Sequence, residues 1–275
     1  MNKTVIDNFL KFNASLLYLP TFLLLAILAF LGSRNLLSNE AYVNSQKDFF
    51  LFMNSELSKY PQTLDNLTQF GDALIILSFV TIFIIYAPKM WEALITGSIV
   101  SAILVGILKP IFGIQRPAAA FGPENLTIIG RKLMGSNSFP SGHSVTVFTV
   151  LTVILIAFMP KKISKQIIWS ICIFTFGIFV ILTRLGVGAH HPLDVTVGAI
   201  IGYISGILGI VINKKYNIWG WIGKKKFYPV FIILFFACSI VVAFKIYNTN
   251  LVVFYLSLIS LLISLFVITN LYVKK

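Results

Sequence analysis

Long apolar runs alternate with short polar segments along this chain of 275 residues. A helix needs roughly twenty apolar residues to cross the hydrocarbon core of a bilayer, and several of the runs approach that length. Because lipid offers the backbone no hydrogen-bond partners, such runs are expected to be helical. The pattern predicts eight membrane spans, at residues 15–31, 73–87, 93–108, 144–159, 167–182, 195–212, 229–244 and 251–273.

Composition supports this interpretation. Hydrophobic residues make up 57% of the chain, charged residues make up 11%, and the mean hydropathy is +0.90, which is too apolar for a soluble globular protein. We therefore predict an all-α, polytopic transmembrane helical bundle. The first run is expected to be a retained helix, since no convincing small-residue cleavage site precedes Ser33 and Arg34. Cys172 and Cys238 fall within predicted spans and are expected to be buried, inert thiols.

The net charge of +13 would suggest a nucleic-acid partner in a soluble protein, but its distribution here indicates membrane topology instead. We expect no nucleic-acid partner. Cytoplasmic loops carry an excess of lysine and arginine, and a cytoplasmic N-terminus would place thirteen of the twenty-two basic residues on that side. These residues are Lys3, Lys11, Lys89, Lys161, Lys162, Lys165, Lys214, Lys215, Lys224, Lys225, Lys226, Lys274 and Lys275.

Two polar segments and one strip of glycines are the other features of the chain that predict structure. Residues 32–72 are long enough to form a small outer subdomain with a helix or two. Residues 117–139 either close over a lipid headgroup or form a solvated loop. Gly198, Gly202 and Gly206 recur every four residues, which predicts a smooth helix face for close packing against a neighbouring helix.

Three polar motifs interrupt the apolar pattern: KPIFGIQRP at 109–117, PSGHS at 140–144 and TRLGVGAHHPLD at 183–194. All three histidines of the chain lie in the last two motifs. Counting crossings through the proposed spans brings every motif to the same, non-cytoplasmic side. Polar motifs scattered at random would have fallen on both sides, so this convergence favours one shared site.

The first motif supplies two cations. Lys109 and Arg116 are seven residues apart, about two helical turns, and would point the same way if the helix continues through both. Pro110 and Gly113 make a kinked or broken helix an equal alternative. Arginine suits bidentate phosphate contacts, and lysine supplies a compact positive charge. Taken alone, the pair has a structural alternative, in which two long cationic side chains extend toward the aqueous edge of the membrane.

The second motif places Ser141, Gly142 and His143 where the fourth span begins. Amides at a helix start, together with a serine hydroxyl, can surround phosphate oxygens, and glycine allows the backbone to approach closely. The structural alternative is an ordinary turn that caps the helix. A histidine at this membrane edge favours chemistry.

The third motif combines Arg184, His190 and Asp194. A carboxylate that accepts a hydrogen bond from one ring nitrogen fixes the tautomer of a histidine and leaves the other nitrogen free to attack. Asp194 would also sit favourably in the first turn of the following helix. His191 is more readily explained as a structural neighbour than as a second nucleophile.

These motifs resemble the tripartite signature of the type 2 phosphatidic acid phosphatase superfamily of lipid phosphate phosphatases. That signature is a lysine, six residues and Arg-Pro; Pro-Ser-Gly-His; and Ser-Arg, five residues, His, three residues and Asp. The one departure here is Thr183 in place of the usual serine, which preserves the hydroxyl. The matching residues are Lys109, Arg116 and Pro117; Pro140, Ser141, Gly142 and His143; and Arg184, His190 and Asp194.

The resemblance implies a role for each matched residue. His190 would attack phosphorus, His143 would protonate the departing lipid oxygen, and Asp194 would orient His190. No metal is implied, because no cluster of carboxylates and histidines suited to divalent ions appears outside these motif residues, and no cofactor is expected. Substrate oxygens would be held by Lys109, Arg116, Ser141, Gly142 and Arg184.

The sequence thus predicts an integral-membrane lipid phosphatase acting through a phosphohistidine on a phosphatidic acid, phosphatidylglycerol phosphate, undecaprenyl diphosphate or lipid A type of substrate. The alternatives are a lipid phosphotransferase and a non-catalytic protein that binds or transports lipid phosphates. The resemblance further implies a bacterial inner membrane, with the active site on the periplasmic face. The predicted divisions are an N-terminal membrane helix and outer loop at residues 1–72, a catalytic membrane core at 73–213, and a cytoplasmic basic loop with two additional membrane helices at 214–275. The resemblance implies a six-helix phosphatase core, to which the two C-terminal helices are added. Nothing in the sequence indicates an oligomeric state.

Overall fold

The computed structural model describes residues 1–274, and Lys275, counted above among the cytoplasmic basic residues, lies outside the described part. Within residues 1–274 every regular element is helical, as the sequence predicts. The elements are α1 (Asn2–Lys11), η1 (Ala14–Leu17), α2 (Tyr18–Ser33), α3 (Asn39–Asn44), α4 (Lys47–Leu57), α5 (Pro61–Thr68), η2 (Gln69–Gly71), α6 (Ala73–Ser78), α7 (Phe83–Tyr86), α8 (Pro88–Phe112), α9 (Pro117–Phe121), η3 (Pro123–Asn125), α10 (Gly142–Ala157), α11 (Ile163–Gly186), α12 (Pro192–Tyr216), η4 (Lys225–Phe227), α13 (Tyr228–Thr249) and α14 (Val252–Val273).

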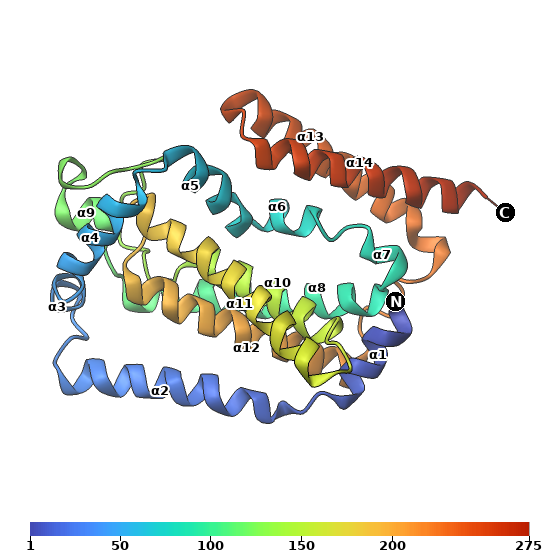
Figure 1. The fold of residues 1–275 in the computed structure, drawn as a ribbon, viewed down its shortest axis with the longest axis horizontal. Coiled ribbons are helices and arrows are strands. Elements are labelled where there is room, and N and C mark those ends of the chain that lie inside the picture. Colours follow the sequence, from blue (N-terminus) through green and yellow to red (C-terminus); the bar gives the residue numbers. More distant parts are fainter. Residues whose placement is uncertain (275) are drawn as a thin grey trace.

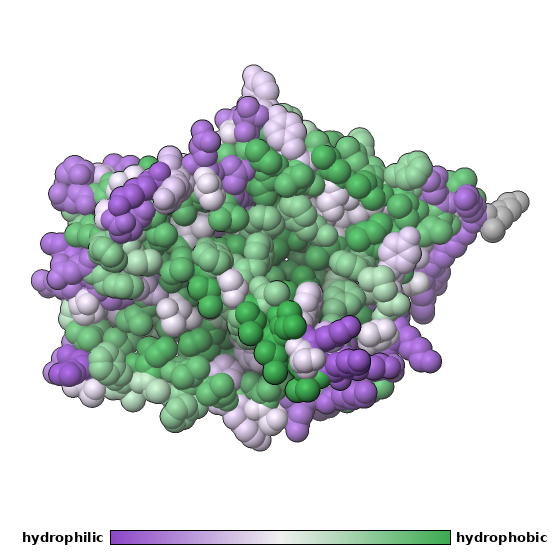
Figure 2. All heavy atoms as spheres, viewed as in Figure 1, coloured by the Kyte–Doolittle hydropathy of each residue, from purple (hydrophilic) through white to green (hydrophobic). Residues whose placement is uncertain are grey.

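The protein is an integral membrane protein. Among the described residues, six helical segments are long and apolar enough to cross a bilayer. Figure 2 shows a broad apolar belt across the middle of the visible face, with polar side chains gathered toward the two ends of the long axis. The six segments are Ala14–Ser33, Pro88–Phe121, Ile163–Gly186, Pro192–Tyr216, Lys225–Thr249 and Val252–Val273.

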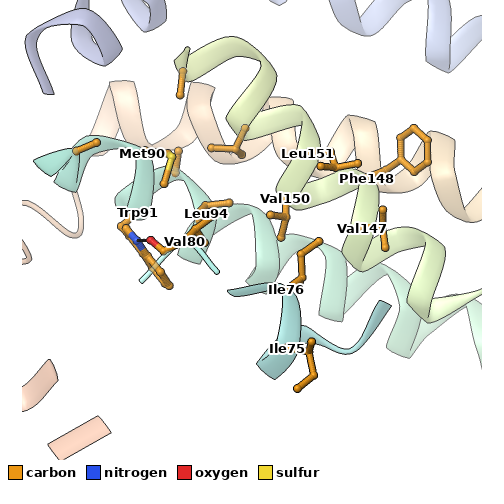
Figure 3. Packing of buried hydrophobic residues seen from close by; sticks show 14 of the residues in the cluster. Ile75, Ile76, Val80, Met90, Trp91, Leu94, Val147, Phe148, Val150 and Leu151 are labelled. Atoms are coloured by element: carbon orange, nitrogen blue, oxygen red, sulfur yellow. Dashed lines mark hydrogen bonds between the residues drawn. The ribbon is translucent and has the colours of Figure 1, made fainter. Parts of the chain in front are cut away.

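The prediction of a continuous span at 73–87 is wrong. This stretch forms two short helices, α6 and α7, separated by residues 79–82. The break is tolerated because side chains satisfy the freed carbonyls: Ser260 donates to Ser78 O at 2.8 Å, and the Trp91 indole donates to Val80 O at 2.8 Å. Figure 3 shows Trp91 and Val80 side by side. The span predicted at 144–159 has the predicted length, because α10 has 16 residues, but it begins two residues earlier, at Gly142.

The centre of the molecule is a tight packing of α10 against α12 and α8. The predicted role of the glycine strip is confirmed, since a Cβ on Gly198, Gly202 or Gly206 would collide with atoms of α10 or of its N-cap, Ser141. Buried aliphatic residues of α6, α8 and α10 fill the space between these helices (Figure 3). The prediction of buried thiols is wrong for Cys172, which is exposed on α11, and Cys238 is only partly buried.

The chain termini and the polar segments lie at opposite ends of the helical bundle. Figure 1 shows both chain termini at one end of the bundle and α3, α4 and α9 at the other. The same far end holds the end of α8 and the starts of α10 and α12. Residues 32–72 form the predicted small outer subdomain, with the three helices α3, α4 and α5. The α13–α14 hairpin lies to one side, against α6 and α5.

Candidate active site

The three sequence motifs meet at the end of the bundle that carries α3, α4 and α9. Lys109 lies in the last turn of α8, which continues through Pro110 to Phe112 and ends where Gly113 adopts a left-handed conformation with φ of 54°. Arg116 therefore follows the helix instead of extending it. His143 is in the first turn of α10, and Arg184 is in the last turn of α11.

His190 and Asp194 form the centre of the site. Both side chains are buried, and His190 Nδ1 lies 3.5 Å from Asp194 Oδ2. The other ring nitrogen, Nε2, lies 3.5 Å from the guanidinium of Arg116. A proton on Nδ1 directed toward Asp194 leaves the Nε2 lone pair facing the cationic side of the site.

The Asp194 carboxylate receives three further hydrogen bonds. Ser138 Oγ donates to Oδ2 at 2.6 Å, the backbone N–H of His191 donates to Oδ2 at 2.9 Å, and Tyr42 Oη donates to Oδ1 at 2.9 Å. Ser138 Oγ also lies 3.4 Å from His190 Nδ1. A buried carboxylate with this many donors is held ionised and in a fixed orientation.

Tyr42 comes from the outer subdomain, 152 positions before its partner Asp194. Gln46 anchors this segment, because its amide donates to Tyr42 O and its Oε1 accepts from the backbone N–H of Leu193. Burial, followed by the negative charge of Asp194, raises the pKa of Tyr42, so its hydroxyl stays protonated and remains a donor. Sequence reasoning missed this residue, and no local signal marks it.

Asn137 joins the two cations of the first motif. Its backbone carbonyl accepts from Lys109 Nζ at 2.5 Å, and its side-chain Oδ1 accepts from Arg116 Nε at 2.7 Å. Arg116 Nη1 also donates to Ala189 O at 3.0 Å. Asn137 and Ser138 directly precede the PSGHS motif, so the polar run ahead of that motif was the signal that could have revealed them.

The site carries uncompensated positive charge. Within residues 1–274, Lys109, Arg116 and Arg184 form no ion pair with a carboxylate. Arg184 is 5% exposed; its Nη1 donates to Thr68 Oγ1 at 2.5 Å, while its buried Nε has no hydrogen-bond partner in the described part of the chain. A buried guanidinium N–H without an acceptor is costly, and an anionic ligand would satisfy it.

The second motif, PSGHS, contributes His143, Ser141 and Gly142 to the site. His143 lies within electrostatic reach of Arg184, His190, Arg116 and Lys109. Its ring packs against Gly71 of η2, where a Cβ would collide with the imidazole.

Ser141 caps α10 by accepting from Ser144 N at 3.4 Å and from Ser144 Oγ at 3.0 Å, and its own N–H donates to Asp194 O at 3.0 Å. It is fully buried, so its structural role as a helix cap is met whether or not it also contacts substrate. Gly142 has open space where a side chain would stand. That space leaves the start of α10 accessible to a ligand.

Burial lowers the pKa of His190 well below that of an ordinary histidine. Desolvation is the main cause that lowers its pKa, to about 3, and the charges of Arg116 and Arg184 act in the same direction, while Asp194 opposes them. His190 is therefore neutral at physiological pH, which is the form that a nucleophilic imidazole requires.

The side chain of His191 is separate from this chemistry. It is fully buried among the rings of Tyr42, Phe50 and Phe121, and its Nε2 lies 2.9 Å from Gln115 O. Burial lowers its pKa. Its contacts agree with the predicted structural role. Across residues 1–274, no three His, Cys, Asp or Glu side chains gather in a way that could hold a metal ion.

Comparison with known proteins shows what the central part of the chain resembles. Residues 91–218 match the family described as the PAP2 superfamily. The chain is 31% identical over 109 residues to the "Bacitracin transport permease protein BcrC" of Bacillus licheniformis, covering 40% of this chain and 48% of that protein. It is 26% identical over 153 residues to the "Lipid A 1-phosphatase" of Rhizobium etli, covering 53% of this chain and 62% of that protein. The chain thus spans about half to three-fifths of the length of these curated relatives.

A solved structure is also similar. The crystal structure of Aquifex aeolicus LpxE shares 26% identity with this chain, with a TM-score of 0.49, covering 60% of this chain and 93% of that one.

Proposed function

We propose that this protein, whose residues 91–218 match the PAP2 superfamily, is a membrane-embedded lipid phosphatase that works through a phosphohistidine on His190. The observation that carries the proposal is the cluster of Lys109, Arg116 and Arg184. These three cations have no carboxylate partner within the described residues and surround two histidines, one of which is held by Asp194. This arrangement suits a phosphate group between the two imidazoles.

The first step forms the covalent intermediate. His190 Nε2 attacks phosphorus, the bond from phosphorus to the lipid oxygen breaks, and that oxygen takes a proton from the His143 imidazolium. The negative phosphate favours this protonated form of His143 before the step. Asp194, which accepts from Nδ1, stabilises the positive charge that develops on the His190 ring.

The second step releases phosphate. Neutral His143 takes a proton from water while the water oxygen attacks phosphorus, and the bond from phosphorus to Nε2 breaks. Inorganic phosphate leaves, and both histidines return to their initial forms. In both steps Lys109, Arg116 and Arg184, with the amide of Gly142 and the hydroxyl of Ser141, would stabilise charge on the equatorial oxygens. The scheme needs no metal and no cofactor.

The substrate class is a lipid whose phosphate lies in the headgroup layer, because the motifs lie at one end of the apolar belt. Phosphatidic acid, phosphatidylglycerol phosphate, undecaprenyl diphosphate and lipid A remain the candidates. The name of the Rhizobium relative makes lipid A the first of these to test. A bacterial inner membrane, with the site on its periplasmic face, is part of the proposal.

The test is phosphate release by detergent-purified protein in EDTA, across a panel of these four lipids. We expect unmodified protein to release phosphate and His190→Ala to lose about a thousandfold or more. Arg184→Ala should also lose activity, whereas Arg131→Ala, which removes an exposed cation outside the motifs, should retain it. Trapped phosphoprotein should be labile in acid and absent from His190→Ala.

The outcomes separate the alternatives. Activity that EDTA abolishes would contradict a metal-free mechanism. Phosphoprotein that transfers its phosphoryl group to an added lipid faster than to water would indicate a phosphotransferase. Tight binding of these lipids without phosphate release and without phosphoprotein would indicate a binding or transport protein.

A further inference from the structure

A groove leads away from His143 toward the opposite side of the membrane. Its outer part has a volume of about 350 Å³ and lies between η2 and α6 on one side and α8 and α10 on the other, with Gly142 and His143 at its outer end. A second cavity of about 260 Å³ continues it inward to Trp91. The two cavities share Leu77, Ser98 and Ala102, so they form one path.

One face of α8 forms the floor of this groove along its whole length. Trp91, Ile95, Ser98, Ala102 and Val105 follow one another at intervals of four, three, four and three residues, which places them on one side of the helix. From Trp91 to Val105 the helix rises about 21 Å, at 1.5 Å per residue. The groove therefore covers about two thirds of a hydrocarbon core roughly 30 Å thick.

Most side chains that line the groove are apolar; apart from His143, its polar lining residues are Asp72, Ser98, Ser101, Thr146 and Thr149. Small side chains and glycine line its outer half. The Thr149 hydroxyl donates to Val145 O at 2.8 Å and the Ser101 hydroxyl donates to Ser98 O at 2.8 Å. These two hydroxyl protons are used within their own helices and are not available to a ligand. Such a surface suits a hydrocarbon chain.

The C-terminal hairpin of α13 and α14 holds in place the wall of the groove that α6 forms. Ser264 of α14 hydrogen-bonds Thr81 at 2.8 Å in the break between α6 and α7, where Ser260 also donates to Ser78 O. Lys245 of α13 forms an ion pair at 2.8 Å with Asp72, the residue that caps α6. These contacts fix a broken membrane segment that would otherwise have unsatisfied backbone groups in lipid.

We infer that this groove binds one hydrocarbon chain of the lipid phosphate, with the phosphate between His143 and His190 and the chain directed toward Trp91. The inference rests on the proposed function. His143 protonates the oxygen that carries the lipid, so the lipid must leave the phosphate on the His143 side, where the groove begins. A separate apolar cavity, which is not part of the groove, is lined by Leu31, Tyr42 and Phe139 and lies on the Tyr42 side of Asp194 instead.

The test uses Ala102→Phe to block the groove and Ile103→Phe as a matched control, because Ile103 is the next residue on α8 and is 55% exposed. Dioctanoyl and dioleoyl phosphatidic acid serve as substrates. For Ala102→Phe, kcat/KM should fall about tenfold or more for the dioleoyl lipid and much less for the dioctanoyl lipid. Ile103→Phe should leave both values close to those of unmodified protein.

Two results would overturn the groove while leaving the phosphatase proposal intact. They are an equal fall for both chain lengths in Ala102→Phe, and no fall for either. Retained activity on the short lipid also shows that the variant is folded.

If unmodified protein hydrolyses neither lipid, the phosphatase proposal fails for phosphatidic acid. The proposal that the groove holds a hydrocarbon chain is then tested by a binding measurement. Phosphatidic acid with brominated chains should quench the fluorescence of the purified protein more than brominated phosphatidylcholine does, since Trp91 lies at the inner end of the groove. That difference should disappear in Trp91→Phe and persist in Trp221→Phe. A difference that persists in Trp91→Phe overturns the proposal.

Discussion

The hydrogen bonds around Asp194 explain how a fully buried carboxylate is kept ionised beside the proposed nucleophile. Removing a carboxylate from water is costly unless donors replace the lost hydration. Tyr42, Ser138 and the His191 backbone N–H supply those donors at 2.9, 2.6 and 2.9 Å. The carboxylate is thereby ready to stabilise an imidazolium on His190 without moving during the reaction.

Replacing Tyr42 with phenylalanine tests this network. The change removes one hydrogen bond to a charged acceptor, which typically contributes about 1.5–3 kcal/mol. We expect kcat to fall roughly ten- to a hundredfold with little change in KM, because the lost bond supports the charged transition state and not substrate binding. Steady-state kinetics on the fastest lipid measures both values. Tyr60→Phe, an exposed tyrosine of the same subdomain, is the control; equal kinetics for the two variants would contradict the role given to Tyr42.

The low pKa of His190 makes stability depend on pH in a defined direction. The folded protein holds His190 neutral down to about pH 3, whereas an unfolded histidine gains a proton near pH 6.5. Between these values the unfolded chain binds the extra proton, so stability is fully present above about pH 6.5 and falls as pH decreases, by up to about 1.4 kcal/mol per unit. Thermal unfolding in detergent at pH 7 and pH 5 should show a smaller loss for His190→Asn, and an equal loss would contradict the shift.

At the scale of elements, the packing of α12 on α10 sets the distance between the two ends that carry Asp194 and His143. Gly202 lies against the backbone of α10, where a Cβ would collide with Val145 O. Gly202→Ala should therefore lower the unfolding temperature and reduce activity. Gly106→Ala, on α8 with open space around the added methyl group, should raise stability slightly, by up to about 1 kcal/mol. Thermal unfolding in detergent compares the two; a similar change in both would contradict close packing at Gly202.

The apolar pattern predicts most of the long helices because twenty-residue apolar runs have few alternatives in lipid. It fails at residues 79–82, where the break depends on donors from Trp91, 11 residues after its acceptor Val80, and from Ser260, 182 residues after its acceptor Ser78. A hydropathy pattern contains no information about such long-range partners. The role of the hairpin as a brace for this break is likewise visible only in three dimensions.

At the scale of the whole molecule, the sequence could predict that the three motifs meet, because they have fixed internal spacings and emerge at one end of the bundle. Tyr42 and the bridging role of Asn137 could not be predicted, since they depend on how the outer subdomain and the 117–139 loop fold back over the helix ends. The roles given to the site residues, and the division of the chain at residues 72 and 213, remain predictions that the variants above address.

The orientation of the whole molecule in the membrane follows from charge. The end that carries the termini should face the cytoplasm, because basic residues are retained on that side, which leaves the site facing outward. Single cysteines at Lys59, in the outer subdomain, and at Lys161, before α11, test this in a Cys172→Ser, Cys238→Ser background. Both positions are exposed. A membrane-impermeant maleimide applied to intact spheroplasts should label Lys59→Cys at once and Lys161→Cys only after permeabilisation. Labelling in the opposite order would place the three cations and both histidines on the cytoplasmic face, and the lipid phosphates of that leaflet would then become the substrates to test.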